Sequence, residues 1–458
     1  MDDPGARPPS GWVHRHRTVY LCTVDLLRIT GSGPLAGEVP ISGSKNAALP
    51  VMAASLLADE PLELVNVPHI EDIGVMAAML RHLGVEAERP GPGRWHLHAA
   101  HVQAADVGAE LTRQMRGSLL LLGALLARAG EAAIAKPGGD DIGMRRVEQH
   151  LEGLRLMGAD VTETGSAFVA RARRLRGAHI FLDIPTVTGT ENLLMAATLA
   201  EGITVISKAA REPHVYDLVR CLVGMGARIS GAGTERIVVE GRGGAPLHGS
   251  LHHLSSDYVE AGTYLAAAAA TGGSITVSGM RPTDLRSFTN KLRSAGCRVV
   301  EGASHVRLAA APLHAVDMTT WPHPGFATDL QPQFGALMTQ ARGVSIISEA
   351  LYENRFRHVP ELRRMGARIA IEGRSAIVSG PTALRGTAVS VPDIRSGAAL
   401  LIAALCADGT TEMAGAFHLD RGYEKLEEKL RSLGATVERV RSATPGHETR
   451  DLSGVIGD

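Results

Sequence analysis

One hydrophobic pattern recurs six times along the chain. In each copy, apolar residues return every three or four positions, a glycine follows, and apolar and polar residues then alternate. The first part is typical of an amphipathic helix, the glycine of a left-handed helix end, and the alternating part of a strand with one buried face. The six glycines are separated by 74, 68, 70, 70 and 68 residues and are Gly84, Gly158, Gly226, Gly296, Gly366 and Gly434.

A second pattern lies between these copies: a helix rich in alanine and leucine, a stop that contains glycine or aspartate, and a β-branched strand. Residues 48–67 and 260–279 are examples. A helix that is apolar on nearly every side is buried, whereas an amphipathic helix covers it. Each period therefore predicts a small sheet packed on two helices. Six periods predict an α/β protein of two domains with three repeats each.

The repeats also suggest domain boundaries. We assign residues 24–44 plus 256–440 to domain 1 and residues 45–255 to domain 2. The stretch before Lys45 and the stretch from His252 to Asp257 would then join the domains as hinges. Residues 1–23 and 441–458 lie outside the repeats and are polar, with glycine and proline. We expect them to form mobile tails without a chemical role.

Composition narrows the function classes. The 458 residues are 45% hydrophobic and carry a formal net charge of −1, which gives no reason to expect nucleic acid or an anionic membrane as the main partner. The four cysteines are far apart and form no CxxC pair, which is typical of reduced thiols in the cytoplasm. Since no leader or membrane-spanning stretch is present, we expect a cytoplasmic protein.

Two turns that contain glycine carry charged side chains beside expected helix starts. ISGSKNAALP, residues 41–50, places Lys45 near backbone N–H groups that favour an anion, although its spacing is not that of a P-loop. A solvated lysine is the alternative. KPGGDDIGMRR, residues 136–146, combines carboxylates and guanidiniums in a glycine loop. It is either a lid that brings an acid–base carboxylate to an anion or an acidic surface loop.

Further charged residues stand near expected helix starts. Asp329 is either a helix N-cap or a base for a hydroxyl group. Together with Lys45 and Arg116, converging arginines would bind a small ligand with several negative charges, such as a phosphate beside a carboxylate. The arginines expected at helix starts are Arg355, Arg357, Arg395 and Arg421. We find no HExxH motif, Cys/His ligand set or dinucleotide GxGxxG motif, so we expect neither a metal nor a cofactor.

In chain order, SGSKNAALP, KPGGDDIGMR, KAAREP, FATDLQPQF, ENRFRHVPEL and HLDRGYEKLEEKLRSLGA resemble motifs of the UDP-N-acetylglucosamine 1-carboxyvinyltransferase family, in the EPSP synthase superfamily. The resemblance runs from about Val24 to Val440. It implies two inside-out α/β barrel domains with the active site between them. It also implies transfer of the enolpyruvyl group of phosphoenolpyruvate to the 3′-hydroxyl of UDP-N-acetylglucosamine (UDP-GlcNAc), the first committed step of peptidoglycan synthesis. The expected partners are these two small molecules, bound by a monomer.

The resemblance also assigns residues by position. It implies catalytic roles for Lys45, for Asp140 as the acid that protonates C3, and for Asp329 as the base on the hydroxyl. The expected contacts of phosphoenolpyruvate are Lys45, Asn46, Arg116, Arg145, Arg355, Arg395 and Arg421. The expected contacts of UDP-GlcNAc are Asn46, Arg116, Arg145, Arg146, Val147, Glu148, Gln149, Thr186, Val187, Thr188, Asp329 and Leu351.

The chain departs from the family pattern at its glycine loop. Asp140 stands where most relatives have cysteine, so the epoxide antibiotic fosfomycin would find no thiol to alkylate. The neighbouring arginines should lower the pKa of Asp140, which opposes its role as an acid. After Arg145, the family continues Pro-hydrophobic-Asp-Leu-His, whereas this chain has Arg146 and the longer acid Glu148.

These departures leave two other functions open. One is a paralogue that uses another uridine nucleotide in specialised metabolism, and the other is a ligand-binding protein without activity. The second is disfavoured because Lys45, Asp329, Arg395 and Arg421 are all present. Relatives begin near Val24, so we also expect residues 1–23 to reflect a start codon assigned too far upstream.

Overall fold

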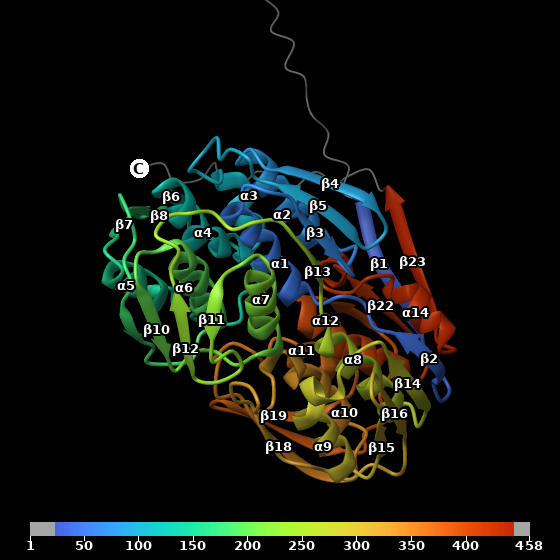
Figure 1. The fold of residues 1–458 in the computed structure, drawn as a ribbon. Coiled ribbons are helices and arrows are strands. Elements are labelled where there is room, and N and C mark those ends of the chain that lie inside the picture. The colour runs from blue at the N-terminus through green and yellow to red at the C-terminus, as the bar shows by residue number, and fades with distance from the viewer. Residues whose placement is uncertain (1–22, 444–458) are drawn as a thin grey trace, which may run out of the picture.

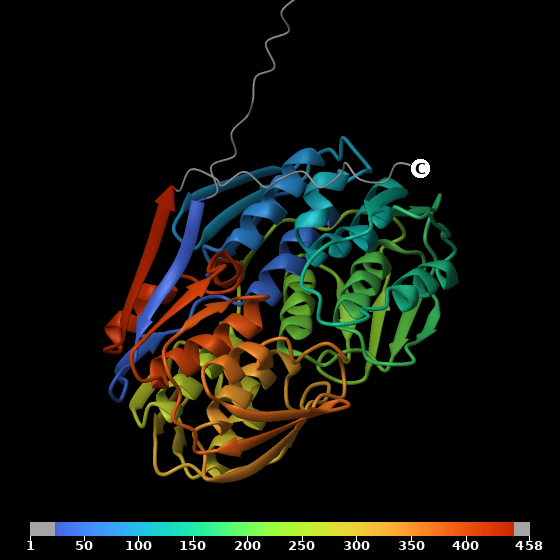
Figure 2. The ribbon, with the colours of Figure 1, turned by 180° about the vertical axis from the view of Figure 1, so that it is seen from behind.

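The computed structural model describes residues 23–443, which form six small sheets with helices packed on them (Figures 1 and 2). Five sheets have four strands and one has three. In each four-stranded sheet, three strands are antiparallel and one edge strand is parallel to its neighbour. The predicted α/β fold of six sheet-and-helix repeats is therefore confirmed.

The elements fall into two groups along the chain. Within residues 45–255 they are α1 (Lys45–Ala54), β3 (Leu62–Val65), α2 (Glu71–His82), β4 (Glu86–Gly91), β5 (Arg94–His98), α3 (Ala109–Gln114), α4 (Leu121–Ala129), β6 (Glu131–Ala135), α5 (Glu148–Leu156), β7 (Asp160–Glu163), β8 (Ala167–Arg171), β9 (His179–Phe181), α6 (Val187–Leu199), β10 (Ile203–Ser207), α7 (Pro213–Gly224), β11 (Arg228–Ser230), β12 (Arg236–Glu240) and β13 (Ser250–His253). Outside that range they are β1 (Thr23–Thr30), β2 (Ala36–Pro40), α8 (Tyr258–Ala270), β14 (Ser274–Ser278), α9 (Arg286–Ser294), β15 (Arg298–Glu301), β16 (His305–Ala309), β17 (Met318–Thr319), α10 (Gln331–Met338), β18 (Gly343–Ser348), α11 (Val359–Arg364), β19 (Arg368–Glu372), β20 (Ser375–Gly380), β21 (Ala388–Ser390), α12 (Ile394–Cys406), β22 (Thr410–Ala414), α13 (Phe417–Asp420), α14 (Leu426–Ser432) and β23 (Thr436–Ala443).

The six repeated glycines end helices as the pattern predicted. Each follows an amphipathic helix and precedes a strand, and all six have φ between +90° and +105°. This is a backbone conformation that side chains with a Cβ rarely adopt. The glycine thus lets the chain leave the helix and return as a strand on the same repeat.

Buried apolar side chains form two separate cores. Core A extends from Ala47 to Leu254, and core B combines residues 27–41 with residues 258–437. Within core A, α1 and α6 are buried on nearly every side, and α8 and α12 play the same part in core B. Of these helices, α1, α8 and α12 are rich in alanine, whose small side chain allows close approach between helices. The two cores match the two-domain organisation that the six repeats predicted.

The chain passes between the cores twice, and the two passages lie side by side. The backbone N–H of Ser44 donates to the carbonyl of Ser255 over 2.8 Å, and that of Asp257 donates to the carbonyl of Ser42 over 2.8 Å. In Figure 1, β1 and β2 lie among the elements of the C-terminal half rather than beside α1. Core B is therefore assembled from both ends of the chain.

The two ends meet in one antiparallel ladder. β1 pairs with β23, and Thr23 is opposite Ala443. The strand thus extends into the segment 441–458 that we predicted as a tail, because β1 offers it backbone partners. The other residues of both predicted tails, and Cys22, lie outside the described residues. Among residues 23–443, no helix is long and apolar enough to cross a membrane.

Candidate functional site

Lys45 begins α1 directly after the first passage between the cores. Ser44 caps the helix by accepting a hydrogen bond from the N–H of Ala47 at 3.4 Å. Gly43 allows the close approach of the chain here, because a Cβ at this position would lie 1.7 Å from the carbonyl oxygen of Asn66. The predicted turn and helix start are confirmed. Lys45 is buried, at 9% exposure, which excludes a solvated lysine.

Asp72, in the first turn of α2, joins Lys45 to Arg421. Its Oδ2 lies 3.0 Å from Lys45 Nζ and its Oδ1 lies 3.0 Å from Arg421 Nε. Arg421 was expected at a helix start. It instead forms the C-cap of the short helix α13, five residues before α14 begins at Leu426, so the expectation for this arginine was wrong. The pairing brings cations from core A and core B together at one carboxylate.

Asp140 lies in the glycine loop between β6 and α5, and its Oδ1 is 2.6 Å from Arg421 Nη1. Burial pushes the pKa of Asp140 upward, but the charge and hydrogen bond of Arg421, with Lys45 and Arg145, outweigh it and hold the pKa below its ordinary value. The loop is therefore not merely acidic surface. The predicted lowering of the Asp140 pKa is confirmed.

The backbone of the loop is held by two arginines in series. The guanidinium of Arg145 donates to the carbonyl of Asp140, and that of Arg116 donates to the carbonyl of Arg145. Burial, and after it the charge of Arg145, lowers the pKa of Arg116 to about 10. Arg116 and Arg145 thus lie in the same group of side chains as Asp140, as the motifs suggested.

The outer side of the loop is attached to the segment before α11, in core B. Glu353 accepts a hydrogen bond from the N–H of Met144 at 2.6 Å, and the Asn354 amide donates to the carbonyl of Asp141 at 3.1 Å. Arg357 donates to the same carbonyl at 3.1 Å. These contacts join the two cores across the site, so the loop adopts a closed position in this structure. We call Glu353, Asn354 and Arg357 the latch.

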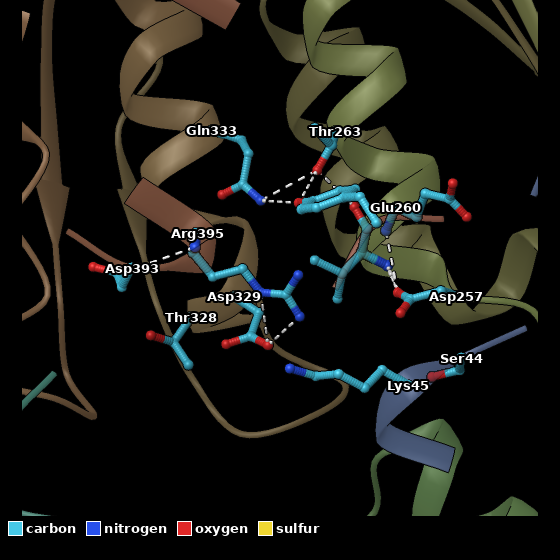
Figure 3. A network of polar contacts seen from close by, with 12 residues as sticks. Ser44, Lys45, Asp257, Glu260, Thr263, Thr328, Asp329, Gln333, Asp393 and Arg395 are labelled. Atoms are coloured by element: carbon cyan, nitrogen blue, oxygen red, sulfur yellow. Dashed lines mark hydrogen bonds and ion pairs between the residues drawn. The ribbon is translucent and has the colours of Figure 1, made fainter. Parts of the chain in front are cut away.

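Asp329 lies in a 3₁₀ turn (Thr328–Leu330) before α10 and is the centre of a second charge cluster. Its Oδ1 is 2.6 Å from Arg355 Nη2 and its Oδ2 is 2.9 Å from Arg395 Nη2, and the side chain of Lys45 points toward it (Figure 3). Burial raises its pKa, but the charges of Arg395 and Arg355 dominate and hold the pKa well below its usual range. Neither the turn nor α10 is capped by a side chain, which excludes the N-cap alternative.

Arg395 is held in place by its own helix. Asp393 caps α12 by accepting from the N–H groups of Arg395 and Ser396, and the Arg395 guanidinium lies over the ring of Tyr423. Both Arg355 and Arg395 are buried, at 3% and 5% exposure. A buried cation requires a partner, and in this structure Asp329 provides it. The predicted position of Arg395 in the first turn of a helix is confirmed.

The residues that the motifs assigned to the nucleotide lie along the starts of α5 and α6. Thr186 caps α6, and Val187 and Thr188 form its first turn. Val147 is half-buried, whereas Arg146 and Glu148 are exposed. The Gln149 amide pairs with the backbone of Ile184, donating at 3.1 Å and accepting at 3.3 Å.

Asn46 and Leu351 are both half-buried, and in the sequence they stand close to the charged residues Lys45 and Arg355. Asn46 follows Lys45, and the N–H of Leu351 donates to Glu349 at 2.8 Å. Within residues 23–443, no group of three or more His, Cys, Asp or Glu side chains is arranged to hold a metal ion.

A sequence profile of the EPSP synthase (3-phosphoshikimate 1-carboxyvinyltransferase) family matches residues 29–430. The chain belongs to this enolpyruvyl transferase family. It is also 47% identical over 419 residues to the UDP-N-acetylglucosamine 1-carboxyvinyltransferase of Magnetococcus marinus, covering 91% of this chain and 100% of that protein. The family identification made from the motifs is confirmed.

Solved structures of enolpyruvyl transferases have the same fold. The enolpyruvyl transferase NikO from Streptomyces tendae matches with a TM-score of 0.83 and 29% identity, covering 92% of this chain and 99% of that one. EPSP synthase from Acinetobacter baumannii matches with a TM-score of 0.72 over 91% of this chain and 100% of its own, and at 19% identity it supports the fold alone.

Two carboxylates of this enolpyruvyl transferase were missed in the sequence. Asp72 resembles any acidic residue in a first helical turn, where a negative charge interacts favourably with the positive end of the helix dipole. Glu349 is buried, at 1% exposure, and accepts from the hydroxyls of Thr320 at 2.8 Å and Thr328 at 2.9 Å. It thereby fixes the turn that carries Asp329. The signal for Asp72 in the sequence is its position at the start of one of the six repeated amphipathic helices.

Proposed function

We propose that this enolpyruvyl transferase transfers the enolpyruvyl group of phosphoenolpyruvate to the 3′-hydroxyl of UDP-GlcNAc and releases phosphate, as a cytoplasmic monomer in peptidoglycan synthesis. The observation that carries the proposal is the convergence of Lys45, Asp140, Asp329, Arg395 and Arg421 from five segments of the two cores. The 47% identity to a protein with this name supports the choice of acceptor.

The cations suit the two ends of phosphoenolpyruvate. Lys45, Arg145 and Arg421 lie around Asp140 and would bind the phosphate, while Arg355 and Arg395 would bind the carboxylate. Guanidinium groups bind both oxyanions through paired hydrogen bonds. In this structure the same arginines hold Asp140 and Asp329, so the substrate would have to take them over from these aspartates.

This exchange would adjust the acid and the base. Arg421 keeps the pKa of Asp140 low, and Arg355 and Arg395 do so for Asp329. When the phosphate and carboxylate of the substrate neutralise these arginines, both aspartates regain affinity for a proton. Asp329 would then take the proton of the 3′-hydroxyl while the hydroxyl oxygen forms a bond to C2 of phosphoenolpyruvate. At the same time, protonated Asp140 would deliver a proton to C3. C3 would then lose a proton to Asp140, and the bond between C2 and the phosphate oxygen would break. These two changes restore the C2–C3 double bond and release phosphate.

The acceptor end follows from the starts of α5 and α6. We assign the diphosphate to Thr186, Val187 and Thr188 and the uracil end to residues 146–149. Asn46, Arg116 and Leu351 would contact the sugar. The reciprocal bond between Gln149 and Ile184 would hold these two helix starts at a constant separation.

The two cores support the domain division. Residues 24–44 plus 256–440 would form domain 1 and residues 45–255 domain 2, with hinges at the two paired passages near Ser44 and Ser255. Opening at these hinges would release the latch and admit the substrates. Since Asp140 has no thiol, the enzyme would be insensitive to fosfomycin.

A second acceptor is supported by the loop itself. Arg146 and Glu148 depart from the family pattern at the uracil end and are both exposed. Another uridine nucleotide, such as UMP, would meet a different charge pattern there. The two acceptors therefore have to be compared directly.

The test measures phosphate release from phosphoenolpyruvate with UDP-GlcNAc or UMP as acceptor. We expect release with UDP-GlcNAc and its loss in Asp329→Asn, with an exposed substitution such as Glu372→Gln as the control. Phosphate release with UMP and none with UDP-GlcNAc would show that UDP-GlcNAc is not the acceptor. If the Asp329→Asn enzyme were as active as the control, Asp329 could not be the base.

A further inference from the structure

Asp72 forms ion pairs with two of the cations that we assign to phosphate binding. Its two oxygens contact different partners, with Oδ2 3.0 Å from Lys45 Nζ and Oδ1 3.0 Å from Arg421 Nε. Asp72 is 4% exposed and lies in the first turn of α2, so its carboxylate is held close to both cations and away from water. One carboxylate thus bridges Lys45 and Arg421 through two oxygens, as a bound phosphate would.

We propose that Asp72 is a positioning residue that serves as the counter-ion of Lys45 and Arg421 when no substrate is bound. When phosphate binds, Asp72 competes with it for these two cations. The proposal rests on the proposed function only in naming phosphate as the anion. This competition would favour the release of the product phosphate, because the Asp72 carboxylate can pair with Lys45 and Arg421 again as phosphate leaves.

The burial of the cations explains why such a counter-ion is needed. The side chains of Lys45 and Arg421 are 11% and 16% exposed, and a cation that is mostly removed from water is costly without a partner. Asp72 keeps both charged and directed to one point between core A and core B. Asp140 contacts the remaining side of Arg421, at 2.6 Å, so this guanidinium already holds two carboxylates.

Competition follows from these contacts. Phosphate can bind Lys45 and Arg421 only by displacing the Asp72 oxygens or by sharing the cations with them. In either case, the negative charge of Asp72 opposes that of the incoming anion at close range. Removing this charge should therefore strengthen phosphate binding, whereas removing a purely structural support should weaken it.

The experiment is a calorimetric titration of the full-length enzyme with inorganic phosphate, without other substrates. Asp72→Asn keeps the size of the side chain and removes its charge. We expect it to bind phosphate about three- to tenfold more tightly than the wild type, as expected for loss of one partly screened charge contact. Asp72→Glu restores the charge, and its phosphate affinity should return toward that of the wild type. Asp72→Ser, a second neutral variant, should follow Asp72→Asn.

The matched control is Asp25→Asn, which removes a carboxylate of β1 that pairs with Arg439 at 2.7 Å rather than with Lys45 or Arg421. Its phosphate affinity should equal that of the wild type. Unchanged or weaker binding in a folded, neutral Asp72 variant would overturn the proposal, as would equal tightening in the control. Phosphate binding is read without turnover, so a wild type that fails to release phosphate from phosphoenolpyruvate would refute the proposed function and leave this result intact.

Discussion

Arg421 and Asp140 are 281 residues apart in the chain, and their side chains meet at 2.6 Å. Arg421 belongs to core B, whereas Asp140 lies in a loop that leaves core A at β6. The contact therefore joins the cores and places a carboxylate at a cation assigned to phosphate. The family resemblance aligns Asp140 with an expected cysteine position, so we expect that one substitution there can change the available chemistry.

Fosfomycin should not modify the wild-type enzyme, because the Asp140 carboxylate is a poor nucleophile toward an epoxide. Asp140→Cys places a thiol beside Arg421 and Lys45, whose charges favour the reactive thiolate. We expect intact mass spectrometry to detect one fosfomycin adduct on Asp140→Cys and none on the wild type. Asp141→Cys, with its side chain exposed on the same loop, is the control and should react more slowly. Labelling of the wild type within the loop would refute the alignment.

The latch predicts a loop whose closure depends on surface contacts. Glu353→Ala removes the acceptor of the Met144 N–H, and Asn354→Ala removes the donor to the Asp141 carbonyl. One exposed hydrogen bond contributes about 0.5–1.5 kcal/mol, so we expect kcat/KM to fall about two- to tenfold in each variant with little change in Tm. Limited proteolysis within residues 136–147 should accelerate in parallel.

The control for the latch is Glu372→Ala, an exposed glutamate at the end of β19. It should leave both kcat/KM and the cleavage rate at wild-type values. Latch variants that cleave at the wild-type rate while losing activity would show that Glu353 and Asn354 act in some other way than by holding the loop.

Local patterns predicted much of this architecture. The six glycines, the capped start of α1 at Lys45 and the loop between β6 and α5 depend on residues close together in the chain, where spacing and backbone preference decide the structure. Those signals also carried the family resemblance.

The charge pairs could not be predicted in this way. Asp72 and Arg421 are 349 residues apart, and neither position has a local preference for the other. Similarly, a sequence pattern cannot exclude an N-cap at Asp329, because the contacts that hold its carboxylate come from the long-range arginines Arg355 and Arg395. The position of Arg421 after α13 was misjudged because a short helix precedes it, where the pattern showed only the longer α14.

Buried histidines predict a loss of stability in mild acid. Burial lowers the pKa of His358, beside α11, to about 4, and its Nδ1 has no hydrogen-bond partner among residues 23–443. The unfolded chain has a histidine pKa of about 6.5 and therefore binds more protons between these values. The stabilisation is complete above pH 6.5 and disappears as the pH falls toward 4, by about 3 kcal/mol for this residue.

His358→Gln tests this assignment, because glutamine keeps polar atoms at the site and does not titrate. Urea unfolding from pH 7 to pH 4 should give a profile that is flatter for the variant than for the wild type. His101→Gln, at an exposed position, should retain the wild-type slope. Parallel profiles for all three proteins would assign the acid sensitivity to other groups.

Two glycines should respond to alanine in opposite directions. At Gly43, a Cβ would lie 1.7 Å from the Asn66 carbonyl oxygen, so the passage between the cores would have to shift, and we expect a loss of about 2 kcal/mol or more. Gly74 lies inside α2 with no atom within 4 Å of the added Cβ. There, alanine should stabilise by about 0.5–1 kcal/mol, because it restricts the unfolded chain and favours the helix. Urea unfolding of both variants measures the signs. If Gly43→Ala were as stable as the wild type, the close approach that positions Lys45 would not need a glycine.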